Sequence, residues 1–256
     1  MIFSSSIEPV YFILPVIGFI VGLLGTMLGG GGGFIFLPTL TLIIGVPTQI
    51  AVITSLVATL PICLIGAISH YNRANINIRI AIIFSVTGLI GALSGVAIAG
   101  RLSSELLKTI FGIYSILMAL NIVLNIRKEN SDNNKSVFNR TKAPFYGFFA
   151  GIATGSLGIS ATAPILAGLF SLSLSVKTAI GTSILIVLSN TLFAAGAHFV
   201  VGEIDMTLLL FLTIGSTLGA LIGPRLLDEI KSNNSNKFKY IYAAVMAILG
   251  TIMILK

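Results

Sequence analysis

The stretch from Pro9 to Asn72 contains no Asp, Glu, Lys or Arg residue. A helix needs about 20 mostly apolar residues to cross a bilayer, so this stretch is long enough for several membrane segments. The composition agrees, because 55% of the 256 residues are hydrophobic and only 9% are charged, whereas roughly 25% of residues are charged in a soluble domain. The sequence therefore excludes a water-soluble globular protein and predicts an all-α integral membrane protein with about eight to ten membrane segments.

A polar segment divides the chain into two similar halves. Residues 127–142 are rich in Asn, Ser and charge, as is typical of a solvated linker. Five apolar blocks precede this segment, at residues 10–28, 34–45, 50–69, 79–100 and 104–126, and five follow it, at residues 144–158, 162–174, 177–200, 206–224 and 238–255. Each half therefore has the same arrangement of blocks.

The halves also share residues at matching spacings. The matching pairs are Thr54-Ser55 with Thr182-Ser183, His70 with His198, and the Gly-Ala-Leu-x-Gly stretches at 91–95 and 219–223. Internal duplication explains several coincidences of type and spacing at once. We therefore predict a single membrane domain over residues 1–256, in which repeat 1 (9–126) and repeat 2 (144–256) are joined by a cytoplasmic linker (127–143).

Basic residues distinguish parallel from inverted repeats. If each half crosses the membrane an even number of times, the repeats are parallel and the basic residues divide almost evenly between the two sides. If the first two blocks of each half instead form a hairpin, the repeats are inverted and twelve of the 15 basic residues share one side. Those twelve are Arg73, Arg79, Arg127, Lys128, Lys135, Arg140, Lys142, Lys177, Arg225, Lys231, Lys237 and Lys239, against Arg101, Lys108 and Lys256. Since basic residues favour the cytoplasmic side, we expect inverted repeats with both termini outside.

An unbroken run of five glycines, Gly29 to Gly33, lies within the first hairpin. Glycine costs a helix about 1 kcal/mol relative to alanine, so the helix should break there. Backbone groups freed inside a membrane must line a cavity or be buried in protein. The short block after the break would begin with its N–H groups and the positive end of its dipole pointing into the membrane, where they attract an anion. Close helix packing is the alternative role for such glycines.

The second half repeats this pattern with more hydroxyl groups, in the stretch GSLGISATAP that ends at Pro164. Two opposed helix N-termini would bind an anion without any buried cation. The Thr-Ser pairs lie early in the following helices, where their hydroxyls either complete the site or bond to their own helix. The predicted substrate-binding residues are Gly29, Gly30, Gly31, Gly32, Gly33, Thr54, Ser55, Gly155, Ser156, Gly158, Ser160, Thr162, Thr182, Ser183 and Asn190.

Enzymatic and metal sites are not expected. Cys63 is the single cysteine, and no cluster of His and Cys has the spacing of metal ligands. His70 and His198 occupy equivalent places near the ends of helices, which in inverted repeats lie on opposite faces, so we expect structural roles for them. All eight acidic residues fall in loops or near block ends. We therefore expect no catalytic residues, no metal and no cofactor.

Taken together, the motifs resemble the sulfite exporter TauE/SafE family. The resemblance rests on GTMLGGGGGFIFLP and its weaker copy GSLGISATAP, on the Thr-Ser pairs and on the Gly-Ala-Leu-x-Gly stretches, and it covers nearly the whole chain. It implies export of a small oxyanion, such as sulfite or the organosulfonate sulfoacetate, across the prokaryotic cytoplasmic membrane. Leu157 and Ile159 stand where the first copy has Gly31 and Gly33, so the two halves of the site differ.

Three rivals to an anion exporter remain: an anion channel, an intramembrane enzyme and a non-transporting assembly partner. The expected partners are a small anionic substrate and the lipid bilayer, with a homo-oligomer as a possible assembly and no nucleic acid, because the basic residues lie in short loops between apolar segments. No carboxylate is expected at mid-membrane to carry a proton. We therefore expect export to be driven by the membrane potential, which contributes about 2.3 kcal/mol per charge per 100 mV.

Overall fold

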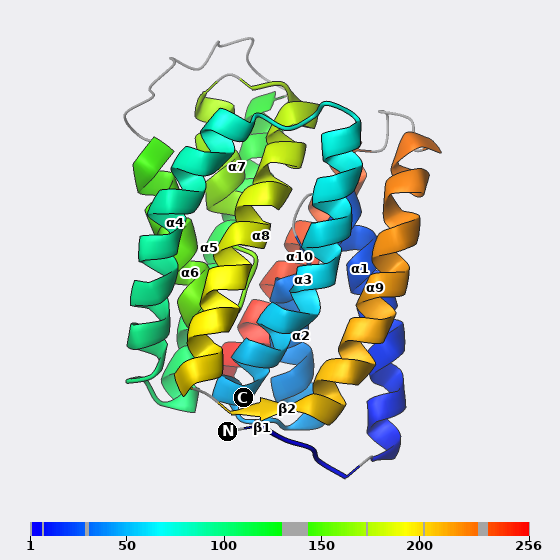
Figure 1. Ribbon diagram of the computed structural model, residues 1–256, viewed down its shortest axis with the longest axis vertical. Helices are drawn as coiled ribbons and strands as arrows, with labels where there is room; N and C mark the ends of the chain where they lie inside the picture. Colours follow the sequence, from blue (N-terminus) through cyan, green and yellow to red (C-terminus); the bar gives the residue numbers. More distant parts are fainter. Residues whose placement is uncertain are drawn as a thin grey trace.

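The computed structural model describes residues 2–6, 8–28, 31–129, 143–172, 174–201, 203–229 and 235–255, and these are almost entirely helical. Helices run along the long axis of one bundle (Figure 1). The first half contains a 3-10 turn (Pro9–Ile13), α1 (Leu14–Leu28), α2 (Gly33–Pro38) with a π turn (Thr39–Ile44), α3 (Thr48–Asn72), α4 (Ile78–Ala99) and α5 (Ser104–Glu129). The second half contains α6 (Ala143–Leu157), α7 (Thr162–Ser171), α8 (Val176–Val201), α9 (Met206–Glu229) and α10 (Ser235–Leu255).

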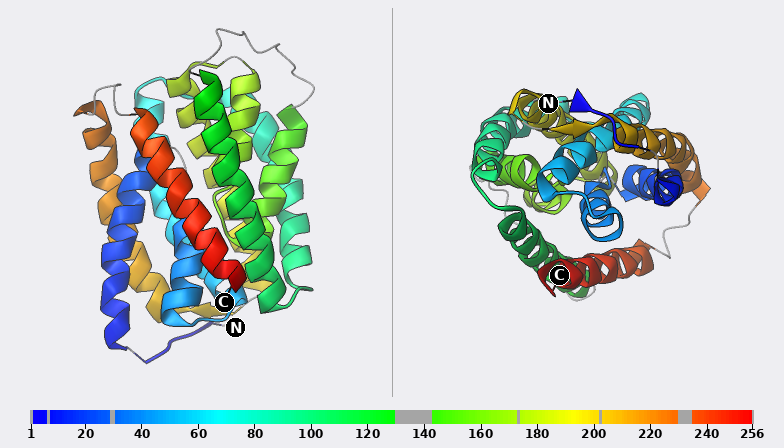
Figure 2. Two further views of the ribbon diagram at one scale, coloured as in Figure 1. Left: turned by 180° about the vertical axis from the view of Figure 1, so that it is seen from behind. Right: turned by 90° about the horizontal axis from the view of Figure 1, so that it is seen from below.

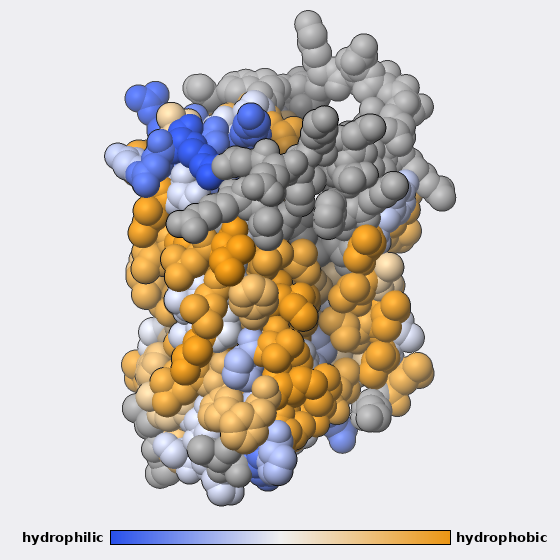
Figure 3. All heavy atoms as spheres, turned by 90° about the vertical axis from the view of Figure 1, so that its right-hand side faces the viewer, coloured by the Kyte–Doolittle hydropathy of each residue, from blue (hydrophilic) through white to orange (hydrophobic). Residues whose placement is uncertain are grey.

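Six helices in the described part of the chain are long and apolar enough to cross a membrane. They cover Pro9–Thr26, Thr48–Asn72, Ile78–Ala99, Ser104–Leu124, Val176–Val200 and Met206–Gly223. Their outward faces are apolar, as on α4, where Ile82, Val86 and Ile90 are each more than half exposed. Figure 3 shows the same on one face of the molecule, where hydrophobic side chains fill the middle. Because water does not stabilise such a surface, these observations establish a multi-pass, all-α integral membrane protein.

Corresponding helices of the two halves run in opposite directions. In Figure 1, α3 starts at the lower end of the bundle and finishes at the upper end, whereas α8 runs from the upper end to the lower end. Both marked ends of the chain lie at the lower end, while α5 ends and α6 begins at the upper end (Figures 1 and 2). The α1–α2 hairpin opens toward the lower end of the bundle, and the α6–α7 hairpin opens toward the upper end.

Glycine residues line the contact faces of the most closely packed helix pairs. Helix α6 packs along α4, and a Cβ atom added at Gly151 would lie 2.1 Å from the carbonyl oxygen of Gly88. Helix α1 packs along α9 in the same way, and a Cβ atom added at Gly219 would lie 2.0 Å from the carbonyl oxygen of Phe19. Small residues every fourth position let helix backbones approach closely in membranes. Each pair therefore joins the hairpin of one half to a long helix of the other.

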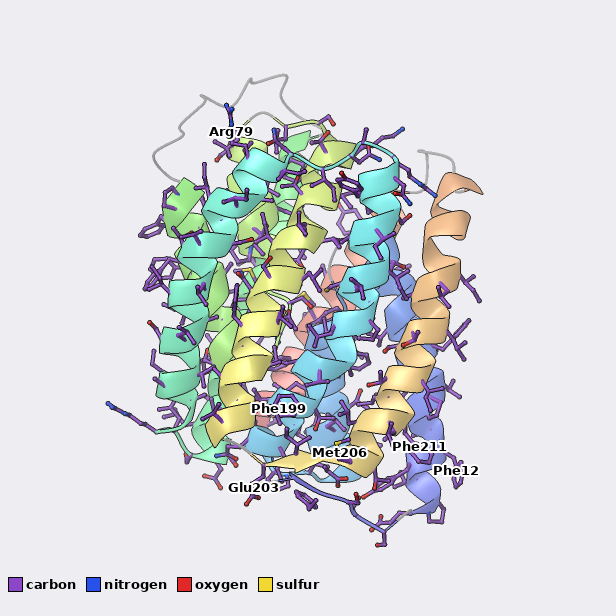
Figure 4. The ribbon with its side chains drawn as sticks, viewed as in Figure 1. Phe12, Arg79, Phe199, Glu203, Met206 and Phe211 are labelled. Carbon is purple, nitrogen blue, oxygen red and sulfur yellow. The ribbon has the colours of Figure 1, made fainter. Side chains whose placement is uncertain are left out.

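Similar side chains cap the N-termini of α4 and α9, which lie at opposite ends of the bundle. The Asn77 carboxamide accepts a hydrogen bond from the Ile80 N–H group at 3.2 Å, and the Asp205 carboxylate accepts one from the Thr207 N–H group at 2.9 Å. Each side chain satisfies a backbone donor that the first helical turn leaves unpaired. Figure 4 places the nearby residues Arg79 and Glu203 at these two ends.

Two short strands at the lower end were not predicted from the sequence. Strand β1 (Ile2–Phe3) pairs in parallel with β2 (Ile204–Asp205). The Asp205 carboxylate also accepts the Ser5 N–H group at 3.3 Å, and the Thr207 hydroxyl donates to the Ser5 carbonyl at 2.9 Å. Figure 4 places Phe12, just after this segment, beside Phe211 of α9, and their ring centroids are 5.6 Å apart. The start of the chain is therefore fastened to the loop between α8 and α9.

Helices α5 and α10 form a crossed pair on one side of the bundle. Seen from below, α5 and α10 lie together on one side of the other helices (Figure 2). They touch at Gly112 and Gly250, where a Cβ atom on either glycine would come within 2.8 Å of the other's carbonyl oxygen. The Thr41 hydroxyl lies 3.3 Å from the Met253 sulfur, so this pair also covers the short helix of the first hairpin.

Candidate functional site

The first helix break lies between α1 and α2. Helix α1 ends at Leu28 and α2 begins at Gly33. Between them, Gly31 and Gly32 have φ angles of +60° and +74°, and Gly32 caps the start of α2. Glycine adopts this left-handed conformation without the steric cost that a Cβ atom imposes, so the glycine run permits the chain to reverse here. The predicted site residues Gly29 and Gly30 lie outside the described residues.

The second break lies between α6 and α7 and is built differently. Gly158 has a φ angle of +65°, but the residue that caps α7 is Ala161, with a φ angle of +38°. A left-handed conformation in a residue other than glycine costs of the order of 1–3 kcal/mol and persists only where the surroundings enforce it. Backbone strain is therefore stored beside the second break.

The two breaks touch each other inside the bundle. The Gly33 N–H group donates to the Ser160 hydroxyl at 3.0 Å. The Ser55 hydroxyl, on α3, lies 2.8 Å from the carbonyl oxygen of Gly158 and 3.1 Å from that of Gly33. We call the contact formed by Gly31, Gly33, Ser55, Gly158 and Ser160 the junction. It brings together five of the predicted site residues from three separate parts of the chain.

The junction is buried and has little free space. Ser55 is fully buried and Ser160 is 4% exposed. A Cβ atom added at Gly31 would lie 2.9 Å from the Cys63 sulfur and from the Ser160 hydroxyl. One added at Gly158 would lie 2.7 Å from the carbonyl oxygen of Val52. In this structure the two breaks are therefore in direct contact, with little space between them.

Two helix N-termini lie at the junction. Helices α2 and α7 both begin there, and the N-terminus of a helix carries a partial positive charge of about half a unit. Among the residues whose burial is described, Asp205 is the one buried carboxylate, and it lies at the start of α9. The described residues also contain no group of three or more His, Cys, Asp or Glu side chains that could hold a metal ion.

Thr54 and Thr182 lie outside the junction. The Thr54 hydroxyl donates to the Ile50 carbonyl of its own helix at 2.8 Å. The Thr182 hydroxyl accepts the Asn77 N–H group at 3.0 Å, at the start of α4. These threonines therefore serve helix ends and helix packing in this conformation.

Among the other predicted residues, Gly155 and Ser156 lie in the last turn of α6, where α6 packs on α4. A Cβ atom added at Gly155 would lie 2.1 Å from the carbonyl oxygen of Ala92, and the Ser156 hydroxyl donates to the Ile152 carbonyl at 2.7 Å. Nε2 of His198 lies 2.8 Å from the carbonyl oxygen of Gly155. His198 therefore ties α8 to the end of α6.

The remaining predicted residues lie on α7 and α8. The Thr162 hydroxyl is 3.5 Å from the Ser160 carbonyl, so Thr162 borders the junction. The Ser183 hydroxyl donates to the Ile180 carbonyl at 2.8 Å. Asn190 lies halfway along α8, against Gly88 of α4.

Three residues beside the junction were missed from the sequence. Thr59 and Cys63 lie against Gly31, and Ala161 turns the chain into α7. Ser55, Thr59 and Cys63 are spaced four residues apart, which places them on one face of α3. That spacing is a signal that could have found Thr59 and Cys63, whereas no sequence pattern marks an alanine with a positive φ angle.

The chain is similar to known membrane proteins over most of its length. The family model described as Sulfite exporter TauE/SafE matches residues 14–253. The probable membrane transporter protein YdhB of Bacillus subtilis is 29% identical over 84% of this chain and 88% of its own length. A probable membrane transporter protein of Xylella fastidiosa (strain 9a5c) is 30% identical over 82% of both chains, and one of Methanocaldococcus jannaschii is 25% identical over 95% of both. No solved structure matches the chain.

Proposed function

Because this chain belongs to the sulfite exporter TauE/SafE family of membrane transporters, we propose that it exports a small oxyanion, either sulfite or an organosulfonate such as sulfoacetate, across the cytoplasmic membrane. The observation that carries this proposal is the junction, where the N-termini of two short helices meet inside an apolar bundle. Such ends are suited to anions, since their N–H groups and dipoles both favour negative charge.

The proposed site needs no buried cation. In the closed conformation, the Gly33 N–H group is held by Ser160, and the Ser55 hydroxyl is held by two carbonyl oxygens. When the breaks separate, these donors exchange their internal partners for the oxygen atoms of the anion. An anion bound by dipoles and neutral donors leaves more readily than one bound by a lysine or arginine, which suits a carrier that must release its cargo.

We also propose that repeats 1 and 2 are inverted and that the junction lies on their axis of pseudosymmetry. Support comes from the opposite directions of α3 and α8 and from the exchange of partners, since α1 packs on α9 just as α6 packs on α4. A site between inverted repeats can open alternately to either side while its own residues stay in place.

Export requires no carried proton in this scheme. An inside-negative potential drives an anion outward, with about 2.3 kcal/mol per charge per 100 mV. A secondary transporter or facilitator that moves one anion at a time is therefore sufficient.

The test is transport by the purified protein in proteoliposomes. We expect uptake of labelled sulfite or sulfoacetate that saturates, that exceeds uptake of sulfate and of a carboxylate control, and that follows a potassium diffusion potential set with valinomycin. Accumulation driven by a pH gradient at zero potential would contradict potential-driven transport. Flux without counterflow would favour an anion channel, and an absence of any anion flux would favour an assembly partner.

A further inference from the structure

Asn190 presents an unsatisfied amide in the middle of a membrane helix. It lies halfway along the span Val176–Val200, and its side chain is fully buried. Neither Oδ1 nor Nδ2 has a hydrogen-bond partner in the described part of the molecule. A buried amide without a partner is strongly unfavourable, most of all at membrane depth, where no water compensates for the loss.

The Asn190 side chain fills the space beside a glycine of α4. A Cβ atom added at Gly88 of α4 would lie 2.2 Å from Oδ1 of Asn190, so the amide occupies the space that this glycine leaves open. The next residue on α8, Thr191, is also fully buried, and its hydroxyl has no partner either. Two adjacent residues of one helix therefore carry three unsatisfied polar atoms.

The matching sequence position in the first half carries an apolar residue. Ile62 follows Thr54 by eight positions, just as Asn190 follows Thr182. Its side chain is 1% exposed, and its Cγ2 atom lies 3.0 Å from a Cβ atom added at Gly25, beside the first break. The first half thus has an apolar side chain at this sequence position, packed against α1, whereas the second half has an unpaired amide against α4.

We infer that Asn190, in the seam between α4 and α8, and the adjacent Thr191 form a second contact for the transported oxyanion, separate from the junction. This inference rests on the proposed function. The amide of Asn190 supplies two N–H donors and the hydroxyl of Thr191 supplies one, which matches the acceptor oxygens of sulfite or a sulfonate. The contact forms when α4 and α8 part during transport, and it exists in only one half, so the two sides of the path are chemically different.

The test compares three single variants with wild type in proteoliposomes and in thermal unfolding with and without sulfite. Asn190→Leu keeps the volume and removes the amide. We expect it to fold with an unchanged or higher Tm, to lose most of the stabilisation that sulfite gives, and to need at least tenfold more sulfite for half-maximal transport. Asn190→Asp at pH 8 places a negative charge at the contact and should lower transport further. The matched control is Ser189→Ala, because that hydroxyl donates to the Leu185 carbonyl of its own helix, and it should behave like wild type.

Several outcomes would overturn the inference. An Asn190→Leu protein that fails to fold, or melts well below wild type, would show that the amide has an internal partner. Wild-type sulfite affinity in a well-folded Asn190→Leu protein would show that the cargo does not use it. Sodium-stimulated transport retained in Asn190→Asp would assign the contact to a cation. If wild type itself neither binds nor carries any of the anions, the proposed function has failed, and that result is distinct from the failure of this inference.

Discussion

Gly33 is the residue at which the closed junction is most sensitive to a single added carbon atom. A Cβ atom there would lie 3.1 Å from the Thr59 hydroxyl and 3.2 Å from both the Gly158 carbonyl oxygen and the Ser160 hydroxyl. Unlike Gly31 and Gly32, Gly33 lies in the helical region, so alanine brings no backbone strain at this position. A substitution at Gly33 can therefore change this contact without distorting the backbone of the break.

Gly33→Ala should fold and lose transport. Alanine favours the helix by about 1 kcal/mol, while its methyl group occupies the point where the two breaks meet and where we propose that the anion binds. Sulfite flux in proteoliposomes is the measurement, with folded protein quantified by size-exclusion chromatography. Gly196→Ala is the matched control, because a Cβ atom at Gly196 has no atom within 4 Å. Wild-type flux in Gly33→Ala would remove the junction as the anion site.

Ser160→Ala should weaken apparent affinity and leave expression unchanged. One donor to a charged ligand is worth about 1.5–3 kcal/mol, which corresponds to roughly ten- to a hundredfold. The concentration of sulfite at half-maximal flux measures this effect. Ser94→Ala serves as the control, since the Ser94 hydroxyl is exposed and donates to the Ile90 carbonyl of its own helix. Equal affinities in the two variants would show that Ser160 has only its structural bond to Gly33.

Residue spacing predicted where the helices break and did not predict which side chains face the breaks. Five consecutive glycines cannot form a packing stripe, so the first break could be inferred from the sequence. Thr54 and Ser55 are adjacent, and adjacent residues on a helix point about 100° apart. The sequence gives no means of telling which of the two faces the junction, and the structure places Ser55 there. Likewise, Gly155 is helical and packs on α4, whereas Gly158 has a positive φ angle at the break, and composition does not encode this difference.

At the scale of helices, glycine stripes fix how the two halves interlock. On α6, Gly147, Gly151 and Gly155 each lie against the backbone or side chains of α4. Gly215, Gly219 and Gly223 of α9 do the same against α1. The Gly-Ala-Leu-x-Gly stretches, seen in the sequence only as evidence of duplication, lie in these same helix pairs. The hairpins that form the junction are therefore held by helices of the opposite half.

Gly151→Leu and Gly219→Leu should each destabilise the protein. Their side chains would meet backbone atoms about 2 Å away, and overpacking typically costs 1–3 kcal/mol or more. A lower Tm in detergent and a smaller yield of monodisperse protein are the expected results. Gly100→Leu is the control, because the atom nearest to an added Cβ atom there is 3.6 Å away. Unchanged stability in both stripe variants would contradict the close helix approach.

Considered as a whole, the molecule has two chemically different ends. The loop between α3 and α4, which begins with Arg73, and the first turn of α4, which contains Arg79, lie at the upper end, and both marked chain ends lie at the lower end (Figures 1 and 4). The charge count from the sequence assigns most basic residues to the side of the linker. We propose on this basis that the upper end is cytoplasmic.

Cysteine labelling tests that orientation directly. In a Cys63→Ala background, Ser4→Cys should react with an impermeant maleimide from outside the cell, and Ser131→Cys should react only after the membrane is opened. Ser131 lies outside the described residues, so its assignment comes from the sequence alone. Labelling of both positions from the same side would contradict inverted repeats.

The exchange of partners between the halves has a consequence for how such a chain is assembled and how it arose. Because α1 packs on α9 and α6 packs on α4, neither hairpin completes its packing within its own half, and α1 lacks this partner until α9 has been made. Likewise, the strand Ile2–Phe3 pairs with Ile204–Asp205, which is made only after both hairpins. With the proposed inverted repeats, an ancestor of half this length would be an intertwined dimer whose two identical subunits entered the membrane in opposite orientations. Cutting the gene within the 130–142 segment should therefore yield two fragments that are unstable when expressed singly and recover sulfite transport when expressed together.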